Sequence, residues 1–359
     1  MTDAFGGIGG IAKFNRDVLT ALAEMPECCR IIAFPRLVQR ESEPIPPNVD
    51  FRLDASEGKL AYIGAVLQFV VSSYSADIVI CGHLNLLPLA WLVSSAKRCP
   101  LLVIVHGIEA WRPHQSLLVR QLIGRVDHVA AVSRFTAERL AAWAGLRTDH
   151  VRILPNCVDL AVFSPRPRNA RIARAFGLDG RRVLLTVGRL AGKDRFKGFD
   201  EVMEVLPVLT REISELTYVI VGDGEDRARL ERKAMELGVV DHVVFTGYVT
   251  EEEKLDFYAL ADAYVMPSRG EGFGIVFLEA MACGVPVIGS ASDGSREALL
   301  DGELGLLVDP DDPDALLQAI REALARPRGR PCGLEYFDAI MFRERLVRLV
   351  REVAARAAR

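Results

Sequence analysis

The sequence predicts an α/β protein built from two doubly wound parallel sheets. Short apolar, β-branched runs alternate with helical patterns along the chain, which is typical of βαβ units. These runs form two series, separated by a proline-rich and charged stretch at 163–176 that has the composition of a linker. The chain has 359 residues, more than one ordinary domain holds. We therefore expect two domains.

The expected elements follow from these runs. Strands are predicted at 29–34, 49–53, 77–81, 100–105 and 128–132 in the first series, and at 181–188, 216–224, 242–247, 262–268 and 285–290 in the second. Helical patterns lie between them, for example at 11–25 and at 133–145, where Ser133 is the expected N-cap and Gly145 the expected end. The tail at 337–359 has the pattern of one basic amphipathic helix.

The predicted domains are 1–165, joined by the returning helix at 337–359, and 166–336. A doubly wound domain should have a strand that feeds its first glycine turn, yet only five residues precede the turn at 6–10. We expect either that the natural start lies upstream or that the first strand is missing. In the second case the first sheet has a gap.

Composition excludes several classes of function. The chain is 50% apolar and 26% charged with a net charge of -4, which is typical of a globular protein and makes nucleic acid an unsuitable partner. Its seven cysteines show no paired short spacing, so we expect reduced thiols. No secretory signal opens the chain and no apolar run reaches membrane-spanning length, so we expect a cytoplasmic location.

The segment at 268–290 has the strongest chemical signature. Three glycines surround Glu271, and Glu279 follows after seven further residues. Glycines let the backbone approach a ligand closely, and a helix opening near Gly274 offers free N–H groups to an anion such as a diphosphate. Carboxylates repel phosphates, so we assign Glu279 to a ribose and Glu271 to a sugar. The backbone expected to line this ligand is Gly272, Phe273, Gly274, Ile275 and Val276.

This segment resembles the signature of family 4 of the retaining glycosyltransferases, and the resemblance extends over nearly the whole chain. It implies the GT-B fold, in which two Rossmann-like domains face each other across a cleft. It also implies that Arg189 and Lys197, within GRLAGKDRFKG at 188–198, clamp the diphosphate of a nucleotide-sugar donor beside Gly188. Two cations there stabilise the charge that builds on the leaving nucleotide.

The resemblance also assigns roles in the first domain. The turn containing Gly7, Gly9 and Gly10 is similar to the family's glycine turn, whose backbone lies against the donor phosphates and sugar. A nicotinamide site is excluded here, because the following strand ends in Phe34 rather than in an acidic residue. His106 follows a predicted strand at the edge where ligands gather, and in the family this histidine contacts the transferred sugar.

Other segments leave alternatives open. Asp223 and Val249 follow strands of the second domain and resemble the family's contacts to ribose and base, but ordinary turns explain them equally well. The acidic run at 309–314 is expected to cap a helix near Asp312, and no metal or cofactor is expected. The donor base is left open between GDP and UDP.

The acceptor, a glycan or a lipid-linked sugar, is expected to meet the first domain. In the loop at 106–115, Trp111 and Arg112 are candidates to face it. The apolar helix at 59–74 is explained either by peripheral membrane contact or by burial in the core. No carboxylate is clearly placed as a nucleophile, so the resemblance implies same-face attack. The alternatives are a non-catalytic nucleotide-sugar-binding protein and a GT-B epimerase.

Overall fold

The computed structural model describes residues 3–39, 44–192 and 195–357, and it divides into two compact units. Unit 1 contains Met1–Cys157 and Ala339–Arg359, and unit 2 contains Val158–Asp338. The chain therefore passes between units at 157/158, whereas the predicted boundary is 165/166. The stretch at 163–176, expected to be a linker, is part of unit 2 because its aromatic ends pack there, with the Phe176 ring 5.3 Å from that of Phe257.

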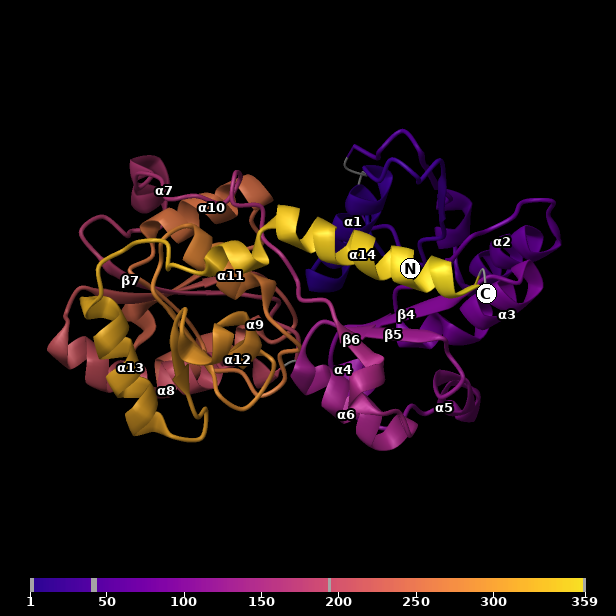
Figure 1. Cartoon of the computed structure of the whole chain (residues 1–359). Coiled ribbons are helices and arrows are strands. Elements are labelled where there is room, and N and C mark those ends of the chain that lie inside the picture. The colour runs from indigo at the N-terminus through magenta and orange to yellow at the C-terminus, as the bar shows by residue number, and fades with distance from the viewer. Residues whose placement is uncertain (1–2, 40–43, 193–194, 358–359) are drawn as a thin grey trace. The chain divides into compact units, whose positions relative to one another are not determined.

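Unit 1 contains two parallel sheets (Figure 1). β1 (Ile31–Ala33) pairs with β2 (Val49–Phe51), and β3 (Val79–Cys81), β4 (Leu101–Val105), β5 (His128–Ala131) and β6 (Val151–Ile153) lie side by side in that order. The five predicted strands are all present, and β6 was not predicted. No strand in the described part of unit 1 joins the two sheets.

The helices of unit 1 cover these sheets. They are α1 (Gly10–Ala23), α2 (Lys59–Val71), α3 (Leu87–Lys97), α4 (Ile108–Trp111), α5 (Leu117–Ile123), α6 (Arg134–Ala144) and α14 (Ala339–Ala357), with short 3-10 turns at Leu53–Ser56, Leu84–Leu86 and Thr148–His150. The expected caps of α6 are confirmed, since the Ser133 side chain accepts from the Thr136 N–H and Gly145 has φ of 67°. α14 packs on α1, where the rings of Phe14 and Phe342 are 5.5 Å apart.

Unit 2 is a single six-stranded parallel sheet in the order β12-β11-β10-β7-β8-β9. The strands are β7 (Arg182–Val187), β8 (Leu216–Val221), β9 (Val243–Gly247), β10 (Ala263–Met266), β11 (Val287–Ser290) and β12 (Leu306–Val308), the last of which was not predicted. From β7 the chain proceeds outward to β9, then returns to the other side of β7 to begin β10. The strand order therefore reverses between β7 and β10, where doubly wound sheets bind ligands.

The helices of unit 2 enclose a buried core. They are α7 (Ala170–Ala175), α8 (Phe199–Glu212), α9 (Arg227–Glu236), α10 (Glu251–Leu260), α11 (Ile275–Ala282), α12 (Ser295–Ala298) and α13 (Pro313–Ala325), with 3-10 turns at Arg195–Lys197, Val240–His242, Leu300–Gly302 and Leu334–Phe337. The strands β8 and β10 are buried along their whole length, as two-sided coverage by helices requires. Asp312 caps α13 by accepting from the Ala315 N–H, as predicted.

An ionic network fixes α8 against α9. Both carboxylate oxygens of Asp200 accept from the Arg229 guanidinium at 2.7 Å, and Lys233 donates to Asp200 at 2.7 Å. Burial alone would raise the pKa of Asp200, but the hydrogen bonds from Arg229 and Lys233 outweigh burial and lower this pKa to about 2. The network therefore stabilises the unit only while Asp200 is ionised.

Candidate functional site

Loops from three adjacent strands meet at the switch point of unit 2. Their described residues are 188–192 and 195–198 after β7, 267–274 after β10 and 291–294 after β11. The backbone N–H of Arg269 donates to the carbonyl of Phe196 at 2.7 Å, and that of Gly294 donates to the carbonyl of Glu271 at 2.9 Å. The three loops therefore form one connected surface at the carboxyl edge of the sheet.

Lys197 and Glu271 form an ion pair on this surface. Lys197 Nζ lies 2.9 Å from Glu271 Oε2, and the two side chains are 18% and 19% exposed. The stem of Lys197 crosses Gly188, because a Cβ added at Gly188 would lie 3.1 Å from Lys197 Cδ. A side chain at position 188 would therefore displace the lysine, which gives this glycine a packing role.

The helix that begins beside this pair has the geometry of an anion site. Gly274, the N-cap of α11, has φ of 90°, and a Cβ there would lie 2.5 Å from the Phe277 ring. The N–H groups of Ile275 and Val276 belong to the first turn and have no acceptor within the helix. Gly272 and Phe273 are buried behind them. The positive end of α11 therefore lies next to Lys197 and Glu271.

Asp293 holds the loop at 267–274 through hydrogen bonds, and the sequence analysis did not identify it. Only 2% of it is exposed, and its carboxylate accepts from the Glu271 N–H at 2.8 Å, the Ser268 hydroxyl at 2.7 Å and the Ser295 N–H at 2.9 Å. Burial raises the pKa of Asp293, and the hydrogen bonds it accepts oppose that rise. Its position three residues after the predicted strand at 285–290 is the sequence signal that could have marked it as a site residue.

Glu279 lies in the interior, one turn into α11. It is 1% exposed, accepts from the Tyr258 hydroxyl at 2.8 Å, and lies 3.0 Å from Lys254 Nζ. Its assignment to ribose stays a prediction, and the geometry adds a condition to it. A ribose hydroxyl must share the carboxylate with Lys254 and Tyr258 or displace one of them.

The far side of the site is formed by the ends of β7, β8 and β9. Arg189 is exposed directly after β7, and the adjacent Leu190 N–H donates to the Asp223 carbonyl at 3.0 Å. Gly222 permits this contact, since a Cβ there would lie 2.0 Å from the Gly188 carbonyl oxygen. Asp223 is exposed and Val249 is half-buried. Both lie along the same strand edge as Arg189, and their ligand contacts stay predictions.

Unit 1 holds the other predicted residues. The glycine turn has φ of 96° at Gly9, and a Cβ at Gly7 would lie 2.8 Å from that of Ala12. The carbonyl oxygens of Ala4 and Gly7 accept from Arg16, which fixes the turn where it meets Gly10 and α1. The turn therefore requires small residues for reasons of backbone geometry alone, whatever its ligand.

His106 follows β4 at the carboxyl edge, as expected. Its Nε2 lies 2.9 Å from the Gly82 carbonyl oxygen and donates to it. The Phe14 ring packs edge-on against the imidazole at 5.0 Å, which brings α1 and His106 together. Within unit 1, the helix of the glycine turn and His106 are therefore neighbours.

The expected acceptor loop differs from the prediction in part. Residues 108–111 form α4, and Trp111 is half-buried and contacts other side chains of the protein. Its Nε1 donates to Thr136 Oγ1 at 3.1 Å and the Arg139 guanidinium lies 5.3 Å from its ring. Arg112, the next residue, is exposed. Trp111 is thus explained by packing on α6.

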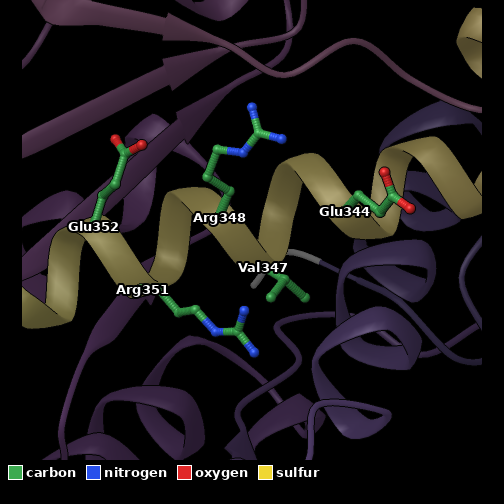
Figure 2. A pocket seen from close by; sticks show the side chains of 5 residues that line it. All are labelled: Glu344, Val347, Arg348, Arg351 and Glu352. Carbon is green, nitrogen blue, oxygen red and sulfur yellow. The ribbon is translucent and has the colours of Figure 1, made fainter.

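A pocket elsewhere in the structure contains none of the predicted site residues. A hollow along α14 is lined by Glu344, Val347, Arg348, Arg351 and Glu352 alone (Figure 2). In the part of the chain that the structure describes, no His, Cys, Asp and Glu residues cluster as a metal site would need. Among the same residues, no helix combines the length and apolar character needed to cross a membrane.

Comparison with known proteins identifies both units. Residues 8–162 match the family described as Glycosyltransferase Family 4, and residues 169–331 match the family described as Glycosyl transferases group 1. Solved structures with the same fold include Anabaena HepE in complex with UDP and glucose, at a TM-score of 0.76 and 19% identity, covering 97% of this chain and 98% of that one. The lipopolysaccharide outer core galactosyltransferase WaaB aligns at a TM-score of 0.72 and 21% identity, covering 98% and 97%.

Sequence relatives are closer. A GDP-mannose-dependent alpha-(1-6)-phosphatidylinositol monomannoside mannosyltransferase of Mycolicibacterium smegmatis is 39% identical over 255 residues, covering 67% of this chain and 66% of the relative. A D-inositol 3-phosphate glycosyltransferase of Acidothermus cellulolyticus is 36% identical over 222 residues, covering 57% and 48%. The chain thus spans about two thirds of the first relative and about half of the second. With two Rossmann-like units and both family matches, the chain belongs to family 4 of the glycosyltransferases.

Proposed function

We propose that this chain is a retaining glycosyltransferase that transfers a hexose from a nucleotide diphosphate sugar to a glycan or a lipid-linked acceptor. The observation that carries the proposal is the Lys197–Glu271 pair at the N-terminal end of α11. A cation, a hydroxyl-accepting carboxylate and an anion-binding helix end are the groups that a sugar diphosphate requires.

The chemistry follows from where charge develops. When the bond between sugar and diphosphate breaks, negative charge grows on the leaving phosphate, and Lys197, Arg189 and the first turn of α11 stabilise it. Glu271, oriented by Lys197, accepts hydrogen bonds from hydroxyls of the sugar. The acceptor attacks the face that the diphosphate leaves, and a leaving phosphate oxygen takes the acceptor's proton. No carboxylate nucleophile is needed, and the sugar keeps its configuration.

GDP-mannose is the donor we favour. The relatives that align at 35% identity or more over about 250 residues are GDP-mannose-dependent mannosyltransferases. The structures solved with UDP or UDP-glucose share only 19% of residues and support the fold alone. UDP-sugars are accordingly the second donor class to test.

The acceptor side supports a lipid-linked substrate at the cytoplasmic membrane face. α2 buries Tyr62 and Val66 but exposes Leu60 and Val71, at 83% and 82%. One face of this helix is therefore part of the core, and the other is exposed and apolar. Peripheral membrane contact through the exposed face is part of the proposal.

Donor turnover is the direct test. We expect purified protein to be stabilised by GDP in a thermal-shift assay and to release GDP from GDP-mannose, with Arg189→Ala weakening both. Stabilisation without any GDP release, across mannosyl and inositol-containing acceptors, would identify a non-catalytic binding protein instead. A shift by UDP but not GDP would replace the donor assignment and leave the transferase proposal standing.

A further inference from the structure

Unit 1 contains a cluster of polar side chains that the proposed donor chemistry does not use. It joins the ends of the adjacent strands β3 and β4, where the Gly82 carbonyl accepts from His106 and the His106 backbone N–H donates to Glu109. His83 and Asn85 follow β3 directly. The charges of Glu109, His106 and His114 all act on the His83 ring, so these side chains lie within electrostatic reach of one another.

Hydrogen bonds fix the orientation of Asn85. His114 Nδ1 accepts from the Ser116 N–H at 3.0 Å, so the proton of this ring is on Nε2. His114 Nε2 lies 2.7 Å from Asn85 Oδ1 and therefore donates to it. The amide oxygen of Asn85 is thereby occupied, and its NH2 group is left to donate outward. His114 acts on Asn85 as a positioning residue.

His83 is fixed in the same way. Its Nδ1 accepts from the Asn85 backbone N–H at 3.1 Å, which leaves the proton on Nε2 as a donor. Burial lowers the pKa of His83, an effect that Glu109 opposes and that His106 and His114 reinforce, so the ring is neutral at pH 7. Glu109 Oε1 accepts from the backbone N–H of His106, and Oε2 is a further acceptor.

The resulting set of groups selects a ligand class. The cluster offers two donors, the Asn85 amide and His83 Nε2, and one acceptor, the second oxygen of Glu109. Hydroxyl groups both donate and accept, so adjacent ring hydroxyls match such a mixed set. A phosphate does not match it, because Glu109 carries a negative charge and none of the described side chains His83, Asn85 and His114 is a fixed cation.

We propose that His83, Asn85 and Glu109 form a subsite for adjacent hydroxyls of a neutral acceptor ring, a sugar or a cyclitol. This inference rests on the proposed transferase function and specifies the part of the acceptor that unit 1 holds. Any lipid or phosphate on the acceptor projects away from these residues. His106 is left to the donor sugar.

Binding of small neutral rings tests the subsite. Methyl α-D-mannopyranoside and myo-inositol are titrated against the full chain saturated with GDP, with saturation-transfer NMR as the readout. We expect one of them to bind in the millimolar range. Asn85→Asp, which keeps the bond from His114 but replaces the outward donors, and Glu109→Gln should each weaken that binding about tenfold, the effect of losing one or two hydrogen bonds. Gln121→Ala, an exposed amide on α5, is the matched control.

The outcomes separate this inference from the proposed function. Asn85→Asp should bind GDP as the wild type does, and loss of GDP binding would show damage to the fold rather than to a subsite. His114→Ala should weaken ring binding in the wild-type background but not in Asn85→Asp. Absence of ring binding in a chain that binds GDP, or equal binding by both variants and wild type, overturns the subsite while leaving the transferase proposal intact.

Discussion

Replacement of Lys197 by methionine isolates the electrostatic part of the proposed site. Methionine keeps most of the stem that crosses Gly188 and removes the ammonium group that lies 2.9 Å from Glu271. Two unit charges about 4 Å apart attract by about 4 kcal/mol at an effective dielectric constant of about 20. Lys197 is 18% exposed, so solvent screens part of this attraction, and about 2 to 3 kcal/mol is left for its contact with a diphosphate.

The energy of the contact between Lys197 and the diphosphate gives the expected decrease in kcat/KM. A loss of about 2 to 3 kcal/mol of transition-state stabilisation lowers kcat/KM by about 30-fold to 150-fold. The assay is GDP release from GDP-mannose with water or methyl α-mannoside as acceptor. Stability should change little, because a partly exposed ion pair contributes at most about 1 kcal/mol, which is a Tm shift of about 2 to 4 °C.

The control lies in the same loop. Arg195 is 61% exposed and lies 3.7 Å from the Asp226 carboxylate, so Arg195→Met should change kcat/KM by less than about threefold. A similarly small effect of Lys197→Met on a folded protein would refute the assignment. If Lys197 acts only by orienting Glu271, Lys197→Met should add nothing to Glu271→Gln, whereas direct contact with the diphosphate makes the two losses multiply.

Three further predictions concern the frame of the site. Gly222→Ala places a Cβ about 2.0 Å from the Gly188 carbonyl oxygen at a φ of 142°, so we expect a lower Tm and weaker GDP binding in thermal melts. An unchanged Tm would contradict the close contact between Gly222 and the Gly188 carbonyl. The pKa of Asp200 is lowered in the folded state from 3.8 to about 2, so the stabilisation by this carboxylate is present above about pH 4 and is lost as the pH falls towards 2. In urea unfolding at pH 7, Asp200→Asn should be about 1 to 2 kcal/mol less stable than the wild type. The same difference in stability at pH 2 would exclude this carboxylate as the cause. Asp293→Ala leaves the Glu271 N–H without its acceptor, and we expect a donor KM raised about tenfold or more with a lower Tm; an unaltered donor KM would show that the loop is held without this carboxylate.

The secondary structure was largely readable from the sequence because its signals are local. The predicted strands are all present, and Ser133 and Asp312 cap the helices as expected. The two missed strands, β6 and β12, have three residues each and are only partly buried, so their patterns are too short to mark a strand in the sequence. The linker assignment at 163–176 was wrong because proline and charge are compatible with packing against α10.

The sequence by itself determined the fold class, the family and the residue types of a sugar-diphosphate site, because glycines, cations and carboxylates at strand ends are visible in the order of the chain. Only the tertiary structure decided which of them meet. Lys197 and Glu271 are 74 positions apart, and they pair because β10 returns to lie beside β7. The burial of Glu279, the support from Asp293 and the orientation of Asn85 by His114 likewise depend on side chains from separate elements. Such contacts depend on strand order and on the direction of each side chain, and neither property is encoded in the spacing of residues along one segment.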